Sequence, residues 1–279
     1  MFNLIKMDLH RLSRSISTYI MIVLAASLAF FTVYMTNHEL NIVKENPPAV
    51  TEISDTDSDE NTFGIVVDTN PMWISGDIDV SEMLGVQLRS NMALILVSIF
   101  VTLFVAAERK NGFIKNIAGQ FHNRSIMVAA KLVAVAVQVL ILFATFVSFI
   151  LISSFIFWGD RLVLASVSEL LQLIGVQYLL HFAFACLITF LCLLSNSSAF
   201  SMTIGILLCS SLGTLVYNLI DRVISNSFRI EMYMLEVNIS YVGAGVSSDV
   251  AARAVVVGIG YILVTMILSM LIVQKRDIK

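Results

Sequence analysis

The sequence has little charge and almost no proline, and both scarcities limit the class of protein. Lys, Arg, Asp and Glu make up 13% of the residues, well below the share of about 25% that is usual in soluble domains. The three prolines, Pro47, Pro48 and Pro71, all lie between the first two long apolar runs. Proline kinks within later runs are therefore excluded, and transporter folds built on broken helices lose support.

Cysteine and glycine patterns exclude further classes of site. Cys186, Cys192 and Cys209 show neither CxxC nor Cys/His ligand spacing, so we expect buried free thiols and no disulfide framework or metal site. None of the 13 glycines is followed by lysine, so the chain has no phosphate-binding loop of the GxxxxGK[ST] type. We expect no cofactor in this chain and no nucleic-acid partner, and any ATP would be held by another subunit.

Six long apolar runs occupy most of the chain, in which 58% of the residues are hydrophobic. Each run is long enough to cross a hydrocarbon core of about 30 Å as a helix. We therefore predict an all-α membrane protein in which residues 1–279 form a single domain with six transmembrane helices. The runs are Tyr19–Thr36, Asn91–Ala107, Ile126–Trp158, Val167–Leu194, Ser198–Ile220 and Ala251–Val273.

Basic residues concentrate on one side of the predicted bundle. With six spans, the two termini share a side with segments 108–125 and 195–197. Together with Lys131, that side holds eleven of the 17 basic residues but only three of the 20 acidic residues. The positive-inside rule makes this side, including both termini, cytoplasmic. Segment 37–90 then forms an extracellular loop or small subdomain.

The extracellular loop contains an acidic stretch that partly matches a calcium-binding loop. Asp55, Asp57 and Asp59 alternate as at the start of an EF-hand. Glu60 stands where that loop needs glycine, and Val66 stands where it needs its last ligand. A solvated acidic loop fits this pattern better, and we predict no metal ligands.

The N-terminal residues 1–18 have the spacing of an amphipathic helix. Lys6, His10 and Arg14 recur on a face different from that of the apolar residues. We predict an interfacial helix that lies on the membrane, the alternative being a basic flank that only orients the first span. The predicted apolar face consists of Phe2, Ile5, Leu9, Leu12 and Ile16.

Segment 108–125, between the second and third spans, has the pattern of a short docking helix. Phe113, Ile117 and Phe121 are spaced i, i+4, i+8, with basic residues between them. Such a ridge can insert into a groove of another protein, and Gly112 would let the chain turn out of the second span. A charged loop on the membrane surface is the alternative interpretation.

The string Glu108-Arg-Lys-Asn-Gly-Phe-Ile-Lys115, followed by Asn123-Arg-Ser125 and Lys131, resembles a known pattern. It is similar to the glutamate, glycine and basic residues after the second span of type-2 ABC exporter permeases. The amphipathic start, large first external loop and short basic tail are similar too, so the likeness covers the whole chain. Within that family the chain most resembles permeases of bacteriocin-immunity and peptide-toxin exporters, including those for phenol-soluble modulins.

The resemblance implies a permease subunit of the bacterial cytoplasmic membrane. It implies two copies of a separate ABC ATPase that bind ATP and magnesium, a second permease chain, identical or paralogous, and an amphipathic peptide as substrate. It also implies that a coupling helix docks on the ATPase, with Ser195-Asn-Ser-Ser198 as a second contact. The implied coupling residues are Glu108, Arg109, Lys110, Gly112, Phe113, Ile114, Lys115, Ile117 and Phe121.

Polar residues inside the spans mark a candidate substrate path. Gln177 and His181 lie one helical turn apart in the fourth span. Ser210, Thr214 and Asn218 form an i, i+4, i+8 stripe in the fifth. Polar groups in a bilayer need partners or water, so these residues either line a path or bond neighbouring helices together.

The apolar segment 221–250 is predicted to form short extracellular or re-entrant helices, with a turn at Gly243 and Gly245. The sequence leaves two alternatives to peptide export. An intramembrane enzyme would use Glu169 and His181, but twelve helical residues separate them by about 18 Å, too far for joint acid–base catalysis. A membrane sensor or scaffold without transport is the other alternative. We predict that the chain itself is not an enzyme.

Overall fold

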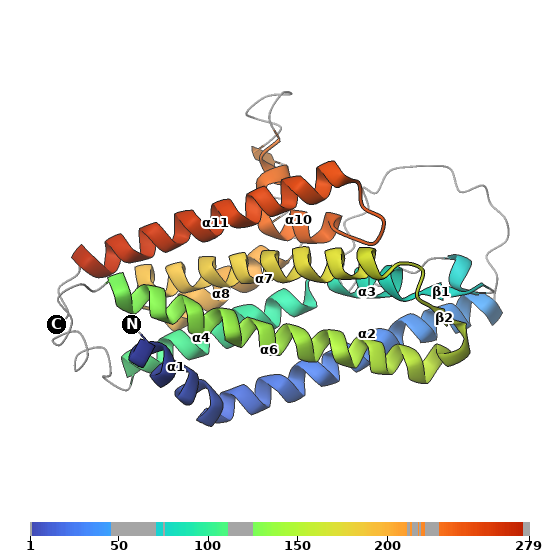
Figure 1. Ribbon diagram of the computed structural model, residues 1–279, viewed down its shortest axis with the longest axis horizontal. Helices are drawn as coiled ribbons and strands as arrows, with labels where there is room; N and C mark the ends of the chain where they lie inside the picture. The colour runs from blue at the N-terminus through green and yellow to red at the C-terminus, as the bar shows by residue number, and fades with distance from the viewer. Residues whose placement is uncertain are drawn as a thin grey trace.

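The computed structural model describes residues 2–45, 71–74, 76–110, 125–210, 213, 217, 219–220 and 229–275. These residues form an elongated bundle of roughly aligned helices (Figure 1). The helices are α1 (Phe2–Arg14), α2 (Ile16–Glu45), α3 (Val80–Arg89), α4 (Met92–Lys110), α6 (Ser125–Trp158), α7 (Val167–Ser195), α8 (Ser198–Cys209), α10 (Leu235–Tyr241) and α11 (Ser248–Lys275). Short 3₁₀ turns are η1 (Pro71–Ile74), η2 (Gly159–Arg161) and η3 (Ile230–Tyr233), and two short strands are β1 (Ile78–Asp79) and β2 (Leu162–Val163).

The prediction of an all-α protein with several membrane-length helices is confirmed, whereas the count of six spans is not. Four helices, α2, α6, α7 and α11, are long and apolar enough to cross a membrane, and α3 with α4 makes a fifth if the bent pair is one span. The predicted fifth run, 198–220, contains α8, which has 12 residues. A helix of that length spans about 18 Å, less than a hydrocarbon core of about 30 Å.

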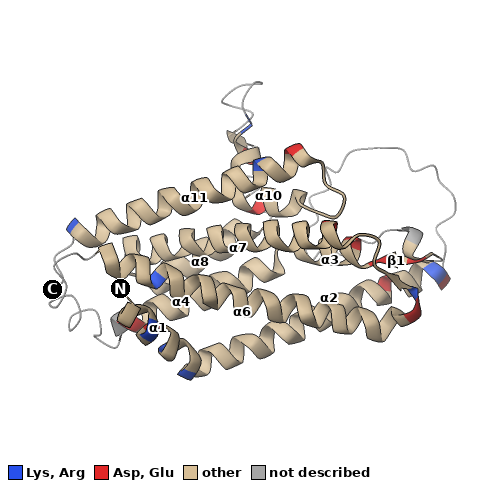
Figure 2. Cartoon of the chain, in the orientation of Figure 1, with Lys and Arg blue, Asp and Glu red and all other residues tan. Residues whose placement is uncertain are grey.

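The chain nevertheless returns across the bundle between α7 and α11. In Figure 1, α7 ends and α8 begins at the end of the bundle where α1 also lies, and α11 ends there as well. The chain must therefore cross back before α11 starts, and α8 makes the first part of that return. Figure 2 shows the described charged residues gathered toward the two ends, with few along the middle of the bundle.

A sharp bend separates α3 from α4, although no proline lies there. Helices α3 and α4 meet at an angle of 55°, and Asn91 between them has a left-handed φ of 57°. Asparagine tolerates this conformation better than most residues, and the Ser90 hydroxyl donates to the Gln87 carbonyl at 2.6 Å. The pair is either one broken span or a re-entrant segment, and the lower weight given to broken-helix transporter folds stays a prediction.

Helix α3 lies in residues that were predicted to belong to the extracellular loop, but its side chains are mostly buried. The Gln87 amide donates to the Thr36 hydroxyl of α2 at 2.8 Å. A Cβ on Gly85 would lie 3.1 Å from the backbone nitrogen of Ala244, so α3 approaches the turn after α10 closely. The loop or subdomain predicted for 37–90 thus contains a packed helix at 80–89; its extracellular position stays a prediction, and its acidic stretch lies outside the described residues.

A short strand pair and an arginine side chain join the segment before α3 to the connection between α6 and α7. β1 pairs in parallel with β2, with Ile78 opposite Leu162. The Arg161 guanidinium donates to the carbonyl oxygens of Trp73 and, at 2.6 Å, Gly76. Trp73 is 1% exposed, which ties the segment before α3 firmly to the bundle.

Helix α7 forms the centre of the bundle and packs against α3, α4, α6, α8, α10 and α11. It is apolar around most of its circumference, as expected of a helix surrounded by protein. Its ends follow local rules: the Ser166 hydroxyl accepts from the Glu169 amide, and Asn196 ends the helix in the left-handed conformation. The described part of 221–250 contains two short helices, η3 and α10, and Gly245 adopts a positive φ of 67° after them. Their extracellular or re-entrant placement stays a prediction.

Candidate functional site

Two acidic and two basic side chains lie together where α1, α4 and α6 meet, and we call Asp8, Arg11, Glu108 and Lys131 the charge cluster. Arg11 Nη2 donates to Glu108 Oε1 at 2.8 Å, and Lys131 Nζ contacts Glu108 Oε2. Asp8 Oδ1 lies 3.9 Å from Arg11 Nη1. The Glu108 and Lys131 side chains are only 9% and 8% exposed. Buried charges of this kind are tolerated because each has an opposite partner.

Glu108 is the centre of the charge cluster because it contacts both basic residues. Through Arg11 it joins the end of α4 to α1, and through Lys131 it joins α4 to the beginning of α6. The Arg11 guanidinium also lies over the Phe104 ring of α4, 4.7 Å from its centre, in a cation–π contact. Three helices are thus held at one point near one end of the bundle.

Asp8 is held less tightly than the other members. Its Oδ1 is buried and has no hydrogen-bond partner among the described residues. Burial raises the pKa of Asp8 above its ordinary 3.8, while the positive charges of Lys131 and Arg11 oppose that rise. The aspartate is therefore a peripheral member of the charge cluster.

Asp8 lies on the face of the N-terminal helix that packs into the bundle. The helix is present over Phe2–Arg14, and its buried residues are Leu4, Asp8 and Leu12. Of the predicted apolar face, Leu12 is buried, Phe2 is 80% exposed, and Ile16, 76% exposed, already belongs to α2. An apolar face that lies on a membrane is exposed from the protein itself, so the interfacial placement of this helix stays a prediction.

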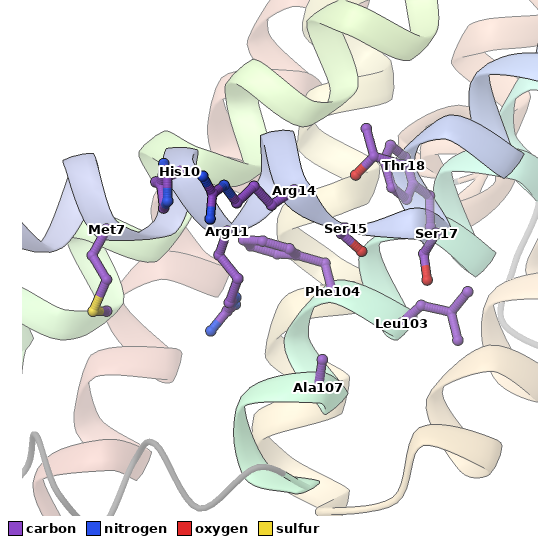
Figure 3. A pocket seen from close by; sticks show the side chains of 11 residues that line it. Met7, His10, Arg11, Arg14, Ser15, Ser17, Thr18, Leu103, Phe104 and Ala107 are labelled. Atoms are coloured by element: carbon purple, nitrogen blue, oxygen red, sulfur yellow. The ribbon is translucent and has the colours of Figure 1, made fainter.

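A cavity of about 430 Å³ lies beside the charge cluster, between α1, the start of α2 and α4 (Figure 3). The Thr18 hydroxyl donates to the Leu12 carbonyl at 2.7 Å, which fixes the turn that forms one wall. We call this space the interfacial cavity. Its lining consists of Met7, His10, Arg11, Arg14, Ser15, Ser17, Thr18, Phe100, Leu103, Phe104 and Ala107.

The predicted coupling residues are only partly described. Glu108 is in the charge cluster, and Arg109 and Lys110 form the last positions of α4. Glu108 and Lys131, which belong to the same sequence pattern, contact each other in the structure. Asp8 and Arg11 join them there, and the sequence did not indicate this. The one available signal was that Asp8 is the only acidic residue in 1–18. Gly112, Phe113, Ile114, Lys115, Ile117 and Phe121 lie outside the described residues.

Gln177 bonds α7 to α10, and His181 bonds within α7 and packs against α6. The Gln177 amide donates to the carbonyl oxygens of Ile239 and Val242 at 3.0 and 2.7 Å, which holds α10 against α7. His181 Nδ1 lies 2.7 Å from the Gln177 carbonyl, and the imidazole packs 5.2 Å from the Phe143 ring. Both side chains are fully buried, and this placement favours packing over the substrate path.

Of the remaining predicted residues, the described ones lie at the two ends of α8. Ser210 ends α8, and its hydroxyl donates to the Leu207 carbonyl at 2.7 Å. Thr214 and Asn218 lie outside the described residues, so the predicted polar stripe stays a prediction. In the turn before α8, the Ser197 hydroxyl accepts from the Phe200 amide at 3.2 Å and caps the helix.

Among the described ranges, no group of three or more His, Cys, Asp or Glu side chains is arranged to hold a metal ion. The fold defines a class, an all-α protein with four or five helices suited to crossing a membrane. No protein-family model matches the chain, and no curated protein matches its sequence. These comparisons identify no family for the chain.

Proposed function

We propose that the protein is the permease subunit of an ATP-driven ABC exporter that moves amphipathic, antimicrobial or toxin peptides out of the cell or its membrane. The observation that carries this proposal is the charge cluster. Glu108 and Lys131 flank segment 111–124, which connects α4 to α6, and they contact each other directly. A force applied to that segment would therefore reach α4 and α6 together, and α1 through Arg11.

The proposed mechanism is indirect. ATP binding closes two ATPase subunits, which supply ATP and magnesium, and their movement acts on the coupling segment 108–121. The charge cluster passes that movement to three helices as one unit, and the interface between two permease chains opens outward. ATP drives this shift only if the closed ATPase pair binds the two permease states unequally.

The proposed arrangement places both termini and the charge cluster on the cytoplasmic side of the bacterial cell membrane. The second permease chain is either identical or paralogous. Ser210, Thr214 and Asn218 remain the proposed path residues at the interface between permeases. Gln177 and His181 contribute mainly by packing, because Gln177 holds α10 against α7 and His181 packs against Phe143 of α6.

Replacing Phe113 and Ile117 together by alanine should weaken the association with the ATPase while leaving membrane insertion intact. The apolar ridge would contribute most of the docking energy, as anchor residues do in helix-in-groove interfaces. The measurement is the yield of ATPase that copurifies with the tagged permease. A matched control is Phe155→Ala with Ile156→Ala, since these α6 side chains are 70% and 63% exposed and removed from the segment. Equal yields for both double variants would contradict the coupling role.

The same copurification distinguishes export from the two other functions. A chain that captures no ATPase but turns over a substrate by itself would be an intramembrane enzyme. A chain that captures no ATPase and shows no turnover would be a sensor or scaffold.

A cysteine at Ser58 should react with an impermeant thiol reagent in intact cells, and a cysteine at Asn116 should not. The positive-inside rule places these positions on opposite sides of the membrane. Background labelling should be low because Cys186, Cys192 and Cys209 are all buried. The measurement is the extent of labelling before and after the cells are opened. Labelling of Asn116 alone in intact cells would reverse the orientation.

A further inference from the structure

The interfacial cavity combines free positive charge with an apolar wall. Arg14 and His10 are exposed, lie one turn apart on α1, and line the cavity. Arg14 forms no ion pair within the described part of the chain, whereas Arg11 is already paired with Glu108 and Asp8. The charge available to a ligand is therefore that of Arg14, and the His10 imidazole adds a hydrogen-bonding group beside it. The hydroxyl groups of Ser15 and Ser17 add hydrogen-bonding capacity beside them.

The opposite wall belongs to α4 and is apolar. Figure 3 shows Leu103, Phe104 and Ala107 on α4, facing the α1–α2 turn across the cavity. Leu103 is 39% exposed, so this wall is open to its surroundings. On α2 the neighbouring side chains of Tyr19 and Ile20 are 60% and 54% exposed. An apolar surface thus leads from the cavity onto the outer face of the bundle.

Helix α2 begins at Ile16 directly after α1 ends at Arg14, so the opposite partial charges of the two helix ends lie together and the arginine supplies the positive charge. A small soluble anion would use the arginine but leave the apolar wall uncovered. An anionic lipid would use both, because its phosphate lies at the membrane edge and its acyl chains extend into the hydrocarbon region.

We infer that the interfacial cavity binds an anionic phospholipid, with the phosphate at Arg14 and His10 and the upper part of an acyl chain along Leu103. The bound lipid would hold α1 against α4 beside the charge cluster. This inference stands apart from the proposed transport function, because it concerns the isolated chain and requires no ATPase.

The test uses the full chain purified in a neutral detergent and titrated with phosphatidylglycerol or with phosphatidylcholine of the same acyl chains. Thermal unfolding is followed with a thiol-reactive fluorophore, which reports the exposure of the three buried cysteines. A ligand that binds only the folded state raises its stability. We expect phosphatidylglycerol to raise the melting temperature more than phosphatidylcholine. Equal shifts would overturn the inference.

Arg14→Gln should weaken phosphatidylglycerol binding about fivefold, since a basic residue near an anionic lipid surface contributes about 1 kcal/mol. The matched control is Lys6→Gln, which removes one exposed positive charge from the same helix but does not line the cavity. We expect Lys6→Gln to bind as the unmodified protein does. Equal weakening by both changes would show a diffuse charge effect and overturn the site.

Two further experiments distinguish a lipid from a soluble phosphate compound and test whether the ligand occupies the cavity. Glycerol phosphate carries the headgroup chemistry without acyl chains, and a shift equal to that of the lipid would assign the cavity to a soluble phosphate compound instead. Ala107→Phe should fill the cavity without changing charge and reduce lipid retention in native mass spectrometry. Undiminished retention by folded Ala107→Phe protein would place the lipid elsewhere.

Discussion

Glu108→Gln is expected to destabilise the purified protein more than removal of any other acidic charge in the charge cluster. The change leaves Lys131 buried without its directly contacting carboxylate and removes the ion pair of Arg11 at 2.8 Å. Breaking one partner of a buried pair typically costs about 3–5 kcal/mol. The measurement is thermal unfolding in detergent, followed by the thiol-reactive fluorophore. A melting temperature equal to that of the unmodified protein would contradict the role of Glu108 as the centre.

Asp8→Asn is the matched control, because it also removes one carboxylate from the charge cluster. Burial raises the folded-state pKa of Asp8, so its proton-linked contribution to stability is complete below its ordinary 3.8 and is lost as the pH rises through the raised value. At neutral pH the ionised carboxylate gives no such benefit. We therefore expect Asp8→Asn to leave the melting temperature unchanged or higher.

The double change Glu108→Gln with Lys131→Met tests whether the two charges act as a pair. Replacing both charges removes the unpaired lysine, so the double variant should regain much of the stability lost by Glu108→Gln alone. The coupling energy from the four proteins of this cycle measures the pair directly. Strictly additive losses would show that Glu108 and Lys131 contribute independently.

Gly205→Leu is expected to separate α8 from α4 and lower the melting temperature strongly. A Cβ at this position would lie 2.0 Å from Ser98 Oγ and 2.7 Å from Ile188 Cδ1, so even the first added carbon has no space. Overpacking of this kind costs about 1–3 kcal/mol and occasionally more, and close helix contacts in membranes commonly depend on small residues. The same unfolding measurement applies.

Gly260→Leu is the control for that change, because it introduces an identical side chain into the exposed face of α11. No heavy atom outside its own helix turn lies within 4 Å of a Cβ at Gly260. Leucine also favours helices more than glycine does, so this variant should melt at or above the temperature of the unmodified protein. Similar losses at both positions would mean that the α4–α8 contact is not tight.

The sequence predicted the main helices well, but less so their ends and their breaks. The run Val167–Leu194 matches α7, Val167–Ser195, almost residue for residue. Helix α2 extends from Ile16 to Glu45, beyond the predicted Tyr19–Thr36, because helical hydrogen bonds continue through polar residues that hydropathy excludes. For the fifth run, continuous hydrophobicity predicted one span, and its described part contains α8, which ends at Cys209; a full span there stays a prediction.

The sequence likewise indicated only some of the residues of the candidate site. Glu108 and Lys131 were both part of the residue pattern that suggested the family, and their spacing on either side of one loop allowed them to meet. Arg11 is 97 positions from Glu108 in the chain, and no local pattern joins the two. Asp8 was hidden because a buried carboxylate contradicts the hydrophobic periodicity on which the predicted face was based.

What the sequence determined by itself is the all-helical, membrane-length character of the chain, because the bilayer imposes it residue by residue: apolar side chains must face lipid or protein, and backbone groups must bond within a helix. The tertiary structure alone decided the break at Asn91, the burial of α3 and the assembly of the charge cluster. These features depend on which distant side chains fill a space or neutralise a charge. Packing among helices determines these contacts, and the hydrophobic periodicity of a single helix does not reveal them.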